Sequence, residues 1–562
     1  MAKINTQFLE KQNRLLVFIL FSVLGFSIYA NTLKGDFIWD DEVLVRGNPA
    51  IRSLVKIPDL FTQDMGGVEH ANQYGFYRPL TMATYSINYA LAKLNVQAYH
   101  LTNIFLHILT AFCIYLAIDL IFKDSLLALF TGALFVIYPV HTEVVAYISG
   151  RQDSLSAVFI LAGFIFYIKY LESGKKWWHW FIIPIYALAL LSKENSLIFP
   201  AILLLYHCAF KKDFKLKGFF IVLGLAFLYL CLRFTILKSA LPHTEMTQAG
   251  YLFYRLPGFF IALANYIRIL IFPFDLHYEY GNDFFKFYDY RAIIGFVLFS
   301  LLLIYAFLKR NKNTLLFFSI CWFFITLLPC TSIYPINAFY MAEHWLYLPS
   351  IGFLIIISKW LIDLLKVKRL RWLVLFLVLS VGVFYSYLSI EQNNYWRGPV
   401  SFYKRTIKYA PCSGQIYYNL GSVYLRAGEY LKAISLFKKA IAMDPKSYRS
   451  YNNLANTYSL LGKHAQAIDM YKKAIDVNQK NYKAYNNLGV IYDGLGKPFE
   501  AIESYEKAIQ VKPDYGDAYF NLAAIYFDLK QYKLSIQYCD KAAEFGYNVS
   551  PHFLKQLGPY KK

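Results

Sequence analysis

The sequence predicts an all-α protein in two parts: a polytopic membrane domain of about eleven transmembrane helices, followed by an α-solenoid. Apolar runs recur between residues 15 and 390, and 57% of the 562 residues are hydrophobic. A membrane span needs about 20 mostly apolar residues. From residue 414 these runs are replaced by a more polar sequence with a period of 34 residues, which is typical of paired helices.

The predicted spans are separated by loops that alternate in charge. Short basic loops, such as residues 309–313 and 366–371, fall between alternate spans, which is the positive-inside pattern. We therefore expect an uncleaved first span with a cytoplasmic N-terminus, and a solenoid on the non-cytoplasmic side. Residues 256–273 are apolar but contain Asn265 and Arg268, so we expect an in-plane or re-entrant segment. The eleven expected spans are residues 15–33, 99–122, 126–138, 152–171, 180–192, 196–210, 217–236, 292–308, 314–329, 346–364 and 372–390.

The composition limits the partners and surroundings of the protein. The formal net charge is +21, but the basic residues cluster in short loops between spans. A lipid bilayer is therefore the expected partner, and nucleic acid is not. The seven cysteines show no paired spacing and predict no disulfide framework. The compact size and the short repeat array favour a bacterial plasma membrane, whereas a eukaryotic host would place the protein in the ER membrane.

The C-terminal third carries four repeats in register. Leu420, Leu454, Leu488 and Leu522 are 34 residues apart, and tyrosines and alanines recur with the same spacing. This is the tetratricopeptide (TPR) pattern, in which each repeat forms a helix–turn–helix unit. The sequence therefore predicts a membrane domain over residues 1–390, a connecting half-repeat over 391–413, four repeats over 414–549 and a polar cap over 550–562.

One polar position recurs on the first helix of every repeat, directly before the packed leucine. A carboxamide there can donate to a peptide carbonyl and accept from a peptide N–H at the same time. A column of carboxamides on the concave face would hold an extended polypeptide by its backbone. The alternative is that these residues cap or solvate the helix face, and that their repetition reflects one ancestral repeat. The four residues are Asn419, Asn453, Asn487 and Asn521.

The conspicuous polar residues outside the repeats lie in loops on the predicted non-cytoplasmic side. The first loop contains the acidic cluster Asp40, Asp41 and Glu42. Charges close to a bilayer are costly unless a site uses them. Ion pairs that anchor the loops are the alternative explanation. The other candidates, from "YRPL", "YPVHTEVVAYISGRQD", "SKEN" and "AEHWLYLPS", are Arg78, His141, Glu143, Arg151, Asp153, Lys193, Glu194, Glu343, His344 and Tyr347.

These motifs, in this order and followed by TPR repeats, resemble the TMTC family, the transmembrane and TPR repeat-containing protein O-mannosyltransferases. More broadly, the chain resembles glycosyltransferases of the GT-C fold. The resemblance extends from residue 15 to about residue 549. The chain departs from the family pattern at His344, where the family has arginine in "AERVLYLPS", and in the short array of four repeats.

The resemblance implies transfer of a sugar, mannose in this family, from a polyprenyl-phosphate (dolichol-type) donor to a Ser or Thr hydroxyl of a protein. The TPR groove would hold that protein acceptor. The residues suit such a reaction, because a hydroxyl needs a base to take its proton as it attacks the anomeric carbon. We expect Asp40 or Asp41 to be the base, with Glu42 as the third carboxylate of the cluster. The leaving phosphate and the sugar would be bound by the charged loops, with positive charge from Arg78, Arg151 and Lys193 and a hydrogen bond from His344.

Several alternatives stay open on sequence alone. Asp40 or Asp41 would hold a divalent cation if the reaction uses one together with a substrate phosphate. His141 and Glu143 lack a third spaced ligand, so we do not expect structural zinc. A polysaccharide ligase or polymerase would use the same kind of donor, and a non-enzymatic membrane scaffold would use only the TPR array. The charged residues lie near span ends, which disfavours a transporter.

Overall fold

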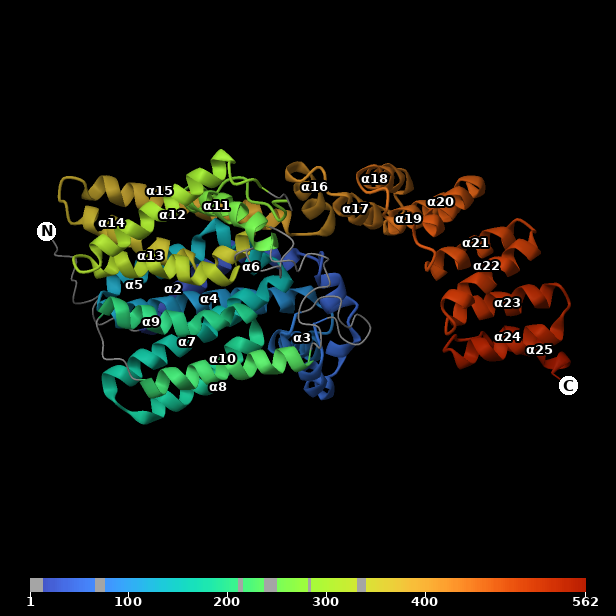
Figure 1. Cartoon of the computed structure of the whole chain (residues 1–562), viewed down its shortest axis with the longest axis horizontal. Helices are drawn as coiled ribbons and strands as arrows, with labels where there is room; N and C mark the ends of the chain where they lie inside the picture. Colours follow the sequence, from blue (N-terminus) through green and yellow to red (C-terminus); the bar gives the residue numbers. More distant parts are fainter. Residues whose placement is uncertain are drawn as a thin grey trace. The chain divides into compact units, whose positions relative to one another are not determined.

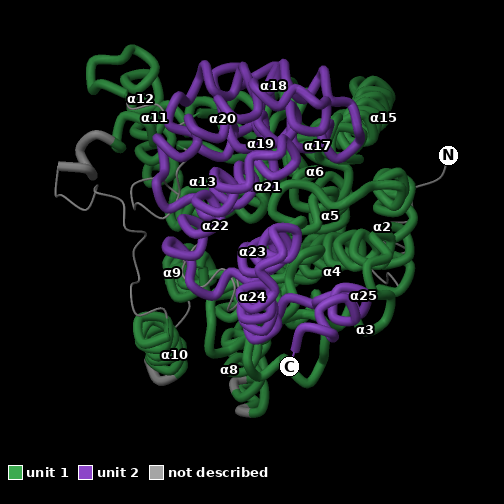
Figure 2. Tube along the Cα trace, turned by 90° about the vertical axis from the view of Figure 1, so that its right-hand side faces the viewer, with its two compact units in different colours: residues 1–405 green, residues 406–562 purple. Residues whose placement is uncertain are grey.

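The computed structural model describes residues 14–65, 76–210, 216–236, 250–281, 285–330 and 340–561. Within these ranges the regular secondary structure consists of helices and includes no strand, so the all-α fold class is confirmed. The chain divides into two compact units, residues 1–405 and 406–562 (Figure 2). The boundary falls inside the predicted connecting segment, on helix α16 (Pro399–Tyr409). The predicted cytoplasmic N-terminus lies outside the described residues.

Unit 1 contains a helix at each of the eleven predicted spans, and further helices between them. Helix α11, which covers most of residues 256–273, packs beside α12. Whether α11 crosses a membrane stays a prediction. The helices of this unit are α2 (Arg14–Tyr29), α3 (Pro79–Ala92), α4 (Val96–Phe122), α5 (Ser125–Ile137), α6 (Thr142–Ala146), α7 (Arg151–Ser173), α8 (Lys176–Ser192), α9 (Phe199–Phe210), α10 (Leu216–Ile236), α11 (Gly250–Ile271), α12 (Tyr290–Lys309), α13 (Thr314–Leu327), α14 (Ser350–Leu365) and α15 (Arg371–Tyr395).

Six helices of the described chain are long and apolar enough to cross a membrane. A seventh crossing results if the bent pair of Ser125–Ile137 and Pro139–Ala146 counts as one span. The segments 180–192, 194–210 and 314–330 are apolar but shorter. The polytopic character is therefore confirmed, while the number of eleven crossings stays a prediction.

Burial separates central helices from peripheral ones within unit 1. The apolar stretches of α4 and α7 are 61% and 67% buried, whereas those of α10, α12 and α15 are 22%, 17% and 11% buried. Apolar side chains exposed on the outer helices are what a bilayer solvates. The core of the unit therefore lies around α4 and α7, which run side by side through the bundle (Figure 1).

The two ends of the helix bundle differ in character. Helices α4, α5 and α7 have one end near Lys123 and Glu172, which form an ion pair of 2.9 Å. At the opposite end, α3 packs against the short helices of residues 49–62, and α6 packs against α4 and α7. The loops rich in candidate site residues meet at this second end.

Unit 2 is a stack of helix pairs, as the TPR pattern predicts. The pairs are closely spaced at small residues: a Cβ on Gly421 would come within 2.8 Å of the Phe437 ring. The TPR repeats are therefore confirmed, while their predicted bounds and the polar cap over residues 550–562 stay predictions. Their helices are α17 (Gly414–Arg426), α18 (Tyr430–Met443), α19 (Tyr448–Leu460), α20 (His464–Val477), α21 (Tyr482–Gly494), α22 (Pro498–Val511), α23 (Gly516–Asp528), α24 (Tyr532–Glu544) and α25 (Pro551–Leu557).

Candidate active site

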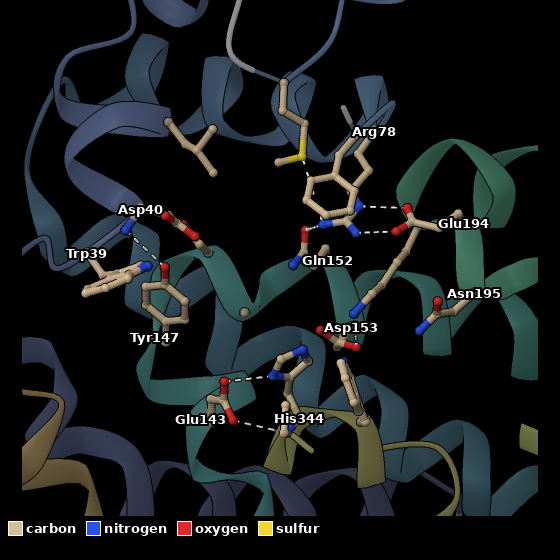
Figure 3. Close-up of a pocket in the computed structure, with 18 of the residues that line it drawn as sticks. Trp39, Asp40, Arg78, Glu143, Tyr147, Gln152, Asp153, Glu194, Asn195 and His344 are labelled. Carbon is tan, nitrogen blue, oxygen red and sulfur yellow. Dashed lines mark hydrogen bonds and ion pairs between the residues drawn. The ribbon is translucent and has the colours of Figure 1, made fainter. Parts of the chain in front are cut away.

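A cavity of about 350 Å³ lies in unit 1 where the charged loops meet (Figure 3). Its size is in the usual range of small-molecule sites. It brings together predicted residues from five separate segments of the chain. The predicted residues that line it are Asp40, Arg78, Glu143, Asp153, Lys193, Glu194 and His344.

The three acids of the cluster have different surroundings. Asp40 lines the cavity, and the Tyr147 hydroxyl accepts a hydrogen bond of 3.2 Å from its backbone N–H. Asp41 is fully buried outside the cavity lining, where its carboxylate accepts from Ser149 N (2.8 Å), Ser149 Oγ and Ile38 N (3.2 Å). Glu42 accepts a hydrogen bond of 2.7 Å from Arg46. The acid that faces the cavity is therefore Asp40.

Burial changes the protonation of both aspartates. Desolvation raises the pKa of Asp40 to about 6, against the opposing effects of the Tyr147 hydroxyl and of the Arg78 charge. Desolvation also raises the pKa of Asp41 to about 7, although Ser149 and the Ile38 N–H stabilise the anion. A carboxylate with a pKa near 6 is a suitable general base at neutral pH.

Arg78 lies opposite Asp40 as part of a buried ion pair (Figure 3). Its Nε donates to Glu194 over 2.8 Å, and its two terminal nitrogens donate to Glu194 and to Gln152. Both charged side chains are less than one-tenth exposed. This two-pronged geometry fixes the guanidinium at the cavity wall. Arg78 directly precedes Pro79, the first residue of α3, and Glu194 opens the short helix after α8.

Lys193 and Asp153 form a second buried ion pair beside the first. The Lys193 Nζ is 2.6 Å from Asp153 Oδ1, and both side chains are less than one-tenth exposed. Asp153 stands in the first turn of α7, where the positive end of the helix dipole favours an acid. Lys193 ends α8 in extended conformation, so its long side chain reaches back to the cavity.

His344 is oriented by Glu143. Its Nδ1 is 2.7 Å from Glu143 Oε1, and its backbone N–H donates to Glu143 Oε2 over 3.0 Å. With Nδ1 held in this way, Nε2 is the ring atom left to face the cavity and Asp153 (Figure 3). Glu143 belongs to α6 and His344 to the short helix Glu343–Leu346.

The side of the cavity near Asp40 is aromatic. Trp39, Tyr147 and Tyr278 line it, with ring centroids of Trp39 and Tyr278 separated by 5.4 Å. Trp39 has a φ of 50°, a left-handed conformation that is uncommon for a bulky residue and typical of functional sites. Sequence reasoning missed these three residues, and also Gln152 and Asn195. Tyr147, Gln152 and Asn195 stand inside the quoted motifs "YPVHTEVVAYISGRQD" and "SKEN", which was the signal available.

Besides Asp41 and Glu42, four more predicted residues lie away from the main cavity lining. Arg151 is fully buried and donates to Asn103, Asn88 and the Tyr99 carbonyl. His141 donates from Nδ1 to the Phe135 carbonyl over 2.9 Å. The Tyr347 hydroxyl donates to His107 over 2.8 Å. Glu343 accepts from the His277 N–H and the Tyr280 hydroxyl. These contacts give the four residues roles in holding the loops and helices around the cavity.

The described residues contain no group of three or more His, Cys, Asp or Glu side chains placed to hold a metal ion. Both oxygens of Asp41 already accept hydrogen bonds. A cation at this site would therefore depend on Asp40 and on oxygens of the substrate, and it stays a prediction.

The repeated asparagines of unit 2 are half-buried and take part in hydrogen bonds. Those of the later repeats donate to the preceding repeat: Asn453 to Ser422 (3.2 Å), Asn487 to Asn456 (3.2 Å) and Asn521 to Asn486 (2.9 Å). Asn419 accepts from Gln415 in the same helix. The asparagines therefore connect successive repeats, and their use in peptide binding stays a prediction.

Together these features define a class: an all-helical membrane protein that carries a TPR solenoid and an acidic, cation-bearing cavity. Family models described as "Tetratricopeptide repeat" match residues 413–480, 449–514 and 491–548. The match confirms the assignment of unit 2.

Curated relatives extend the similarity into unit 1. "Protein O-mannosyl-transferase F38B6.6" of Caenorhabditis elegans is 26% identical over 73% of this chain and 59% of its own length. "Protein O-mannosyl-transferase TMTC3" of Mus musculus is 23% identical over 74% of this chain and 50% of its own length. "Protein O-mannosyl-transferase TMTC4" of Homo sapiens is 25% identical over 72% of this chain and 63% of its own length. The resemblance to the TMTC family is confirmed. The aligned part is between half and two thirds of the length of these relatives.

Proposed function

We propose that this chain is a membrane glycosyltransferase that moves a mannosyl group from a polyprenyl-phosphate donor to Ser or Thr hydroxyls of proteins. The observation that carries the proposal is the cavity in which the Asp40 carboxylate faces the buried cations Arg78 and Lys193. The names of the similar proteins, all protein O-mannosyl-transferases, support the same chemistry.

The proposed reaction is a single inverting displacement. Asp40 accepts the proton of the acceptor hydroxyl as its oxygen attacks the anomeric carbon. The bond between this carbon and the phosphate oxygen breaks, and its electron pair stays on the leaving polyprenyl phosphate. General-base assistance of this kind contributes about 10²–10⁴-fold to the rate. The pKa of about 6 leaves Asp40 ionised at neutral pH and able to hold the proton.

Positive charge is needed where the phosphate leaves. Lys193 has three N–H donors and gives one of them to Asp153, so the others can reach a phosphate oxygen. Arg78 adds a fixed charge, because Glu194 and Gln152 hold its guanidinium. His344 offers Nε2 from the same part of the cavity (Figure 3). An in-line displacement needs the base and the leaving group on opposite faces of the sugar, and the positions of Asp40 and Arg78 on different sides of the cavity support this (Figure 3).

We further propose that the cavity opens on the non-cytoplasmic face, with unit 2 on the same side to hold the protein acceptor. The alternating basic loops support this orientation. The compartment follows from the host: the plasma membrane of a bacterium or the ER membrane of a eukaryote.

Transfer of a radiolabelled mannosyl group from polyprenyl-phosphate mannose to a Ser/Thr-rich peptide tests the proposal. The purified wild-type protein should label the peptide, and Asp40→Asn should lower the rate about 10²-fold or more. Asp59→Asn is the matched control, because it makes the same change at an exposed position of the same loop. Equal thermal stability of the three proteins excludes unfolding as the cause.

Three outcomes would contradict the proposal. Label that moves to an added oligosaccharide and not to peptide would favour a polysaccharide ligase or polymerase. Absence of both transfer and donor binding would favour a non-enzymatic scaffold. Full activity of Asp40→Asn would assign the base to another residue.

A further inference from the structure

Asp153 holds an unused hydrogen-bond acceptor in the cavity. Its Oδ1 accepts from Lys193 over 2.6 Å, whereas its Oδ2 is buried and has no hydrogen-bond partner among the residues that the structure describes. The side chain is only 9% exposed and lines the cavity. A buried carboxylate oxygen without a donor costs free energy, so its persistence calls for an explanation.

Several donors near Asp153 already have other partners. The Asn195 amide donates to Cys330 Sγ over 3.0 Å, and His344 Nδ1 is held by Glu143. The Arg78 nitrogens donate to Glu194 and Gln152. No donor of the described residues bonds to Asp153 Oδ2, which leaves this oxygen available to a hydroxyl that enters the cavity with a ligand.

The space beside Asp153 suits a small polar group. A second cavity of about 20 Å³ adjoins the first and shares Asp153, Asn195, His344 and Trp345 with it. This volume is close to the minimum that holds one water molecule, and hence one hydroxyl group. Asp40 lies on a different side of the main cavity (Figure 3). A ring placed between Asp40 and Asp153 would direct its outer substituents to the smaller cavity.

We propose that Asp153 Oδ2 accepts a hydrogen bond from one ring hydroxyl of the transferred sugar, and so determines which sugars the site takes. This inference rests on the proposed function and deepens it. Lys193 holds Asp153 in place and compensates its negative charge. A neutral amide at position 153 would gain less from the neighbouring Lys193 charge. The ligand class is a polyprenyl-phosphate hexose that carries a hydroxyl at the position facing Asp153.

The consequence is a strong discrimination at one position of the sugar. A site built to bind a substrate hydroxyl rejects the analogue that lacks it by up to about 10⁴–10⁵-fold, because a buried polar group is then left unpaired. Removal of a hydroxyl that only contacts solvent or an apolar wall lowers the affinity and the rate far less. One monodeoxy donor should therefore be much poorer than the others.

Competition binding and transfer rates with the 2-, 3-, 4- and 6-deoxy forms of polyprenyl-phosphate mannose test the inference in the full-length wild-type protein. We expect one deoxy donor to lose at least about 10²-fold in kcat/KM and in affinity. Asp153→Asn should reduce that loss to about tenfold or less, while the ratios for the other donors stay the same. Glu172→Gln, an exposed acid at the far end of the same helix, is the control and should keep the wild-type ratios.

The results separate this inference from the proposed function. If wild type transfers mannose but discriminates against no single deoxy donor, or if Asp153→Asn keeps the full discrimination, Asp153 does not read a hydroxyl. If no peptide is labelled, the proposed transfer fails, and the binding ratios still decide the role of Asp153. Because the wild-type series needs no variant, poor folding of Asp153→Asn does not remove the test.

Discussion

Asp40 and Asp41 are neighbours in the sequence, yet their carboxylates face different surroundings. Asp40 borders an open cavity, whereas Asp41 is enclosed and accepts three hydrogen bonds from Ser149 and Ile38. Adjacent residues in an irregular segment point in different directions. Asp40 can therefore take part in the reaction while Asp41 holds the backbone of the segment that carries Asp40. This division predicts different phenotypes for the two residues.

The proposed base predicts a pH profile for Asp40. Its pKa is raised to about 6 by burial, and only the ionised form accepts a proton. We expect kcat/KM to rise with pH and to reach half of its plateau near pH 6. Measured transfer rates between pH 4.5 and 8 would check this, and Asp40→Asn should show a low rate without that rise. A wild-type profile that is flat below pH 7 would count against Asp40.

Asp41 predicts a stability effect. Asp41→Ala leaves three donors around the site without their acceptor, which costs about 1 kcal/mol each, or about 3 kcal/mol in total. Thermal unfolding in detergent should show a clear loss of stability, whereas Asp40→Asn should show little. An unchanged melting temperature for Asp41→Ala would contradict the supporting role.

The raised pKa of Asp41 also gives a sign for the pH dependence of stability. Its folded-state pKa of about 7 lies above the ordinary value, so the folded state binds this proton more tightly. The stabilisation is complete below about pH 4 and is lost as the pH rises through about 7. Wild type should therefore lose more stability between pH 4 and 7 than Asp41→Ala does, as measured by the same thermal unfolding.

At the scale of elements, the segment of residues 272–281 carries Tyr278 to the cavity and is tied down by Glu343. Glu343 accepts from the His277 N–H (2.5 Å) and the Tyr280 hydroxyl (2.6 Å). The Leu276 carbonyl accepts from Gln392 and Arg405. Burial and then the nearby Glu143 raise the pKa of Glu343 to about 8, so it holds a proton at neutral pH.

Loss of this tie should affect catalysis through the segment. We expect Glu343→Ala to lower kcat/KM about tenfold, because a displaced Tyr278 opens the aromatic wall, a misplacement of the kind that costs 10–100-fold. Glu343→Gln keeps an accepting oxygen and the uncharged state, so it should retain most of the activity. Transfer assays on both variants test this expectation. An equal loss of activity in Glu343→Gln and Glu343→Ala would contradict the role of Glu343 as an uncharged acceptor that holds the segment.

Helix packing gives a second prediction at this scale. A Cβ on Gly352 of α14 would overlap the carbonyl oxygen of Ser319 on α13, whereas one on Gly224 of α10 meets nothing within 4 Å. Close helix contacts in membrane proteins depend on such small residues. Gly352→Ala should lower thermal stability by about 1–3 kcal/mol through overpacking. Gly224→Ala should leave it unchanged or slightly raised, and similar effects of the two changes would contradict the packing.

The elements were predictable because their signals are local. Apolar runs and the 34-residue period locate the helices without any long-range information. The site was predictable only in part, since the sequence gives the loops but not their register. Arg151 and Asp153 stand two residues apart in one motif, yet only Asp153 reaches the cavity. Trp39 depends on a left-handed backbone, and Tyr278 on a distant tie, so no local pattern marked them.

At the scale of the whole molecule, the chain combines a unit with the candidate active site and a unit with the repeats. A protein held by the repeats stays at high local concentration near a site on the same chain, which lowers the affinity that the cavity itself must supply. This advantage applies only to acceptors long enough to contact both. Acceptor length therefore separates the contributions of the two units.

The repeated asparagines are the place to test this division. Asn453→Ala with Asn487→Ala removes two carboxamides proposed to bind the acceptor backbone, and also their bonds to Ser422 and Asn456. We expect KM to rise about tenfold for a long unfolded acceptor polypeptide and to stay constant for a short Ser/Thr peptide, with kcat unchanged for both. The lost bonds between repeats should cost about 1 kcal/mol each in the stability of unit 2.

Lys438→Ala, at an exposed position on the second helix of the first repeat, is the control. If stability falls while KM for the long acceptor stays the same, the asparagines only connect the repeats. If KM for the short peptide also rises, the substitutions affect the cavity as well, and the two units do not act separately.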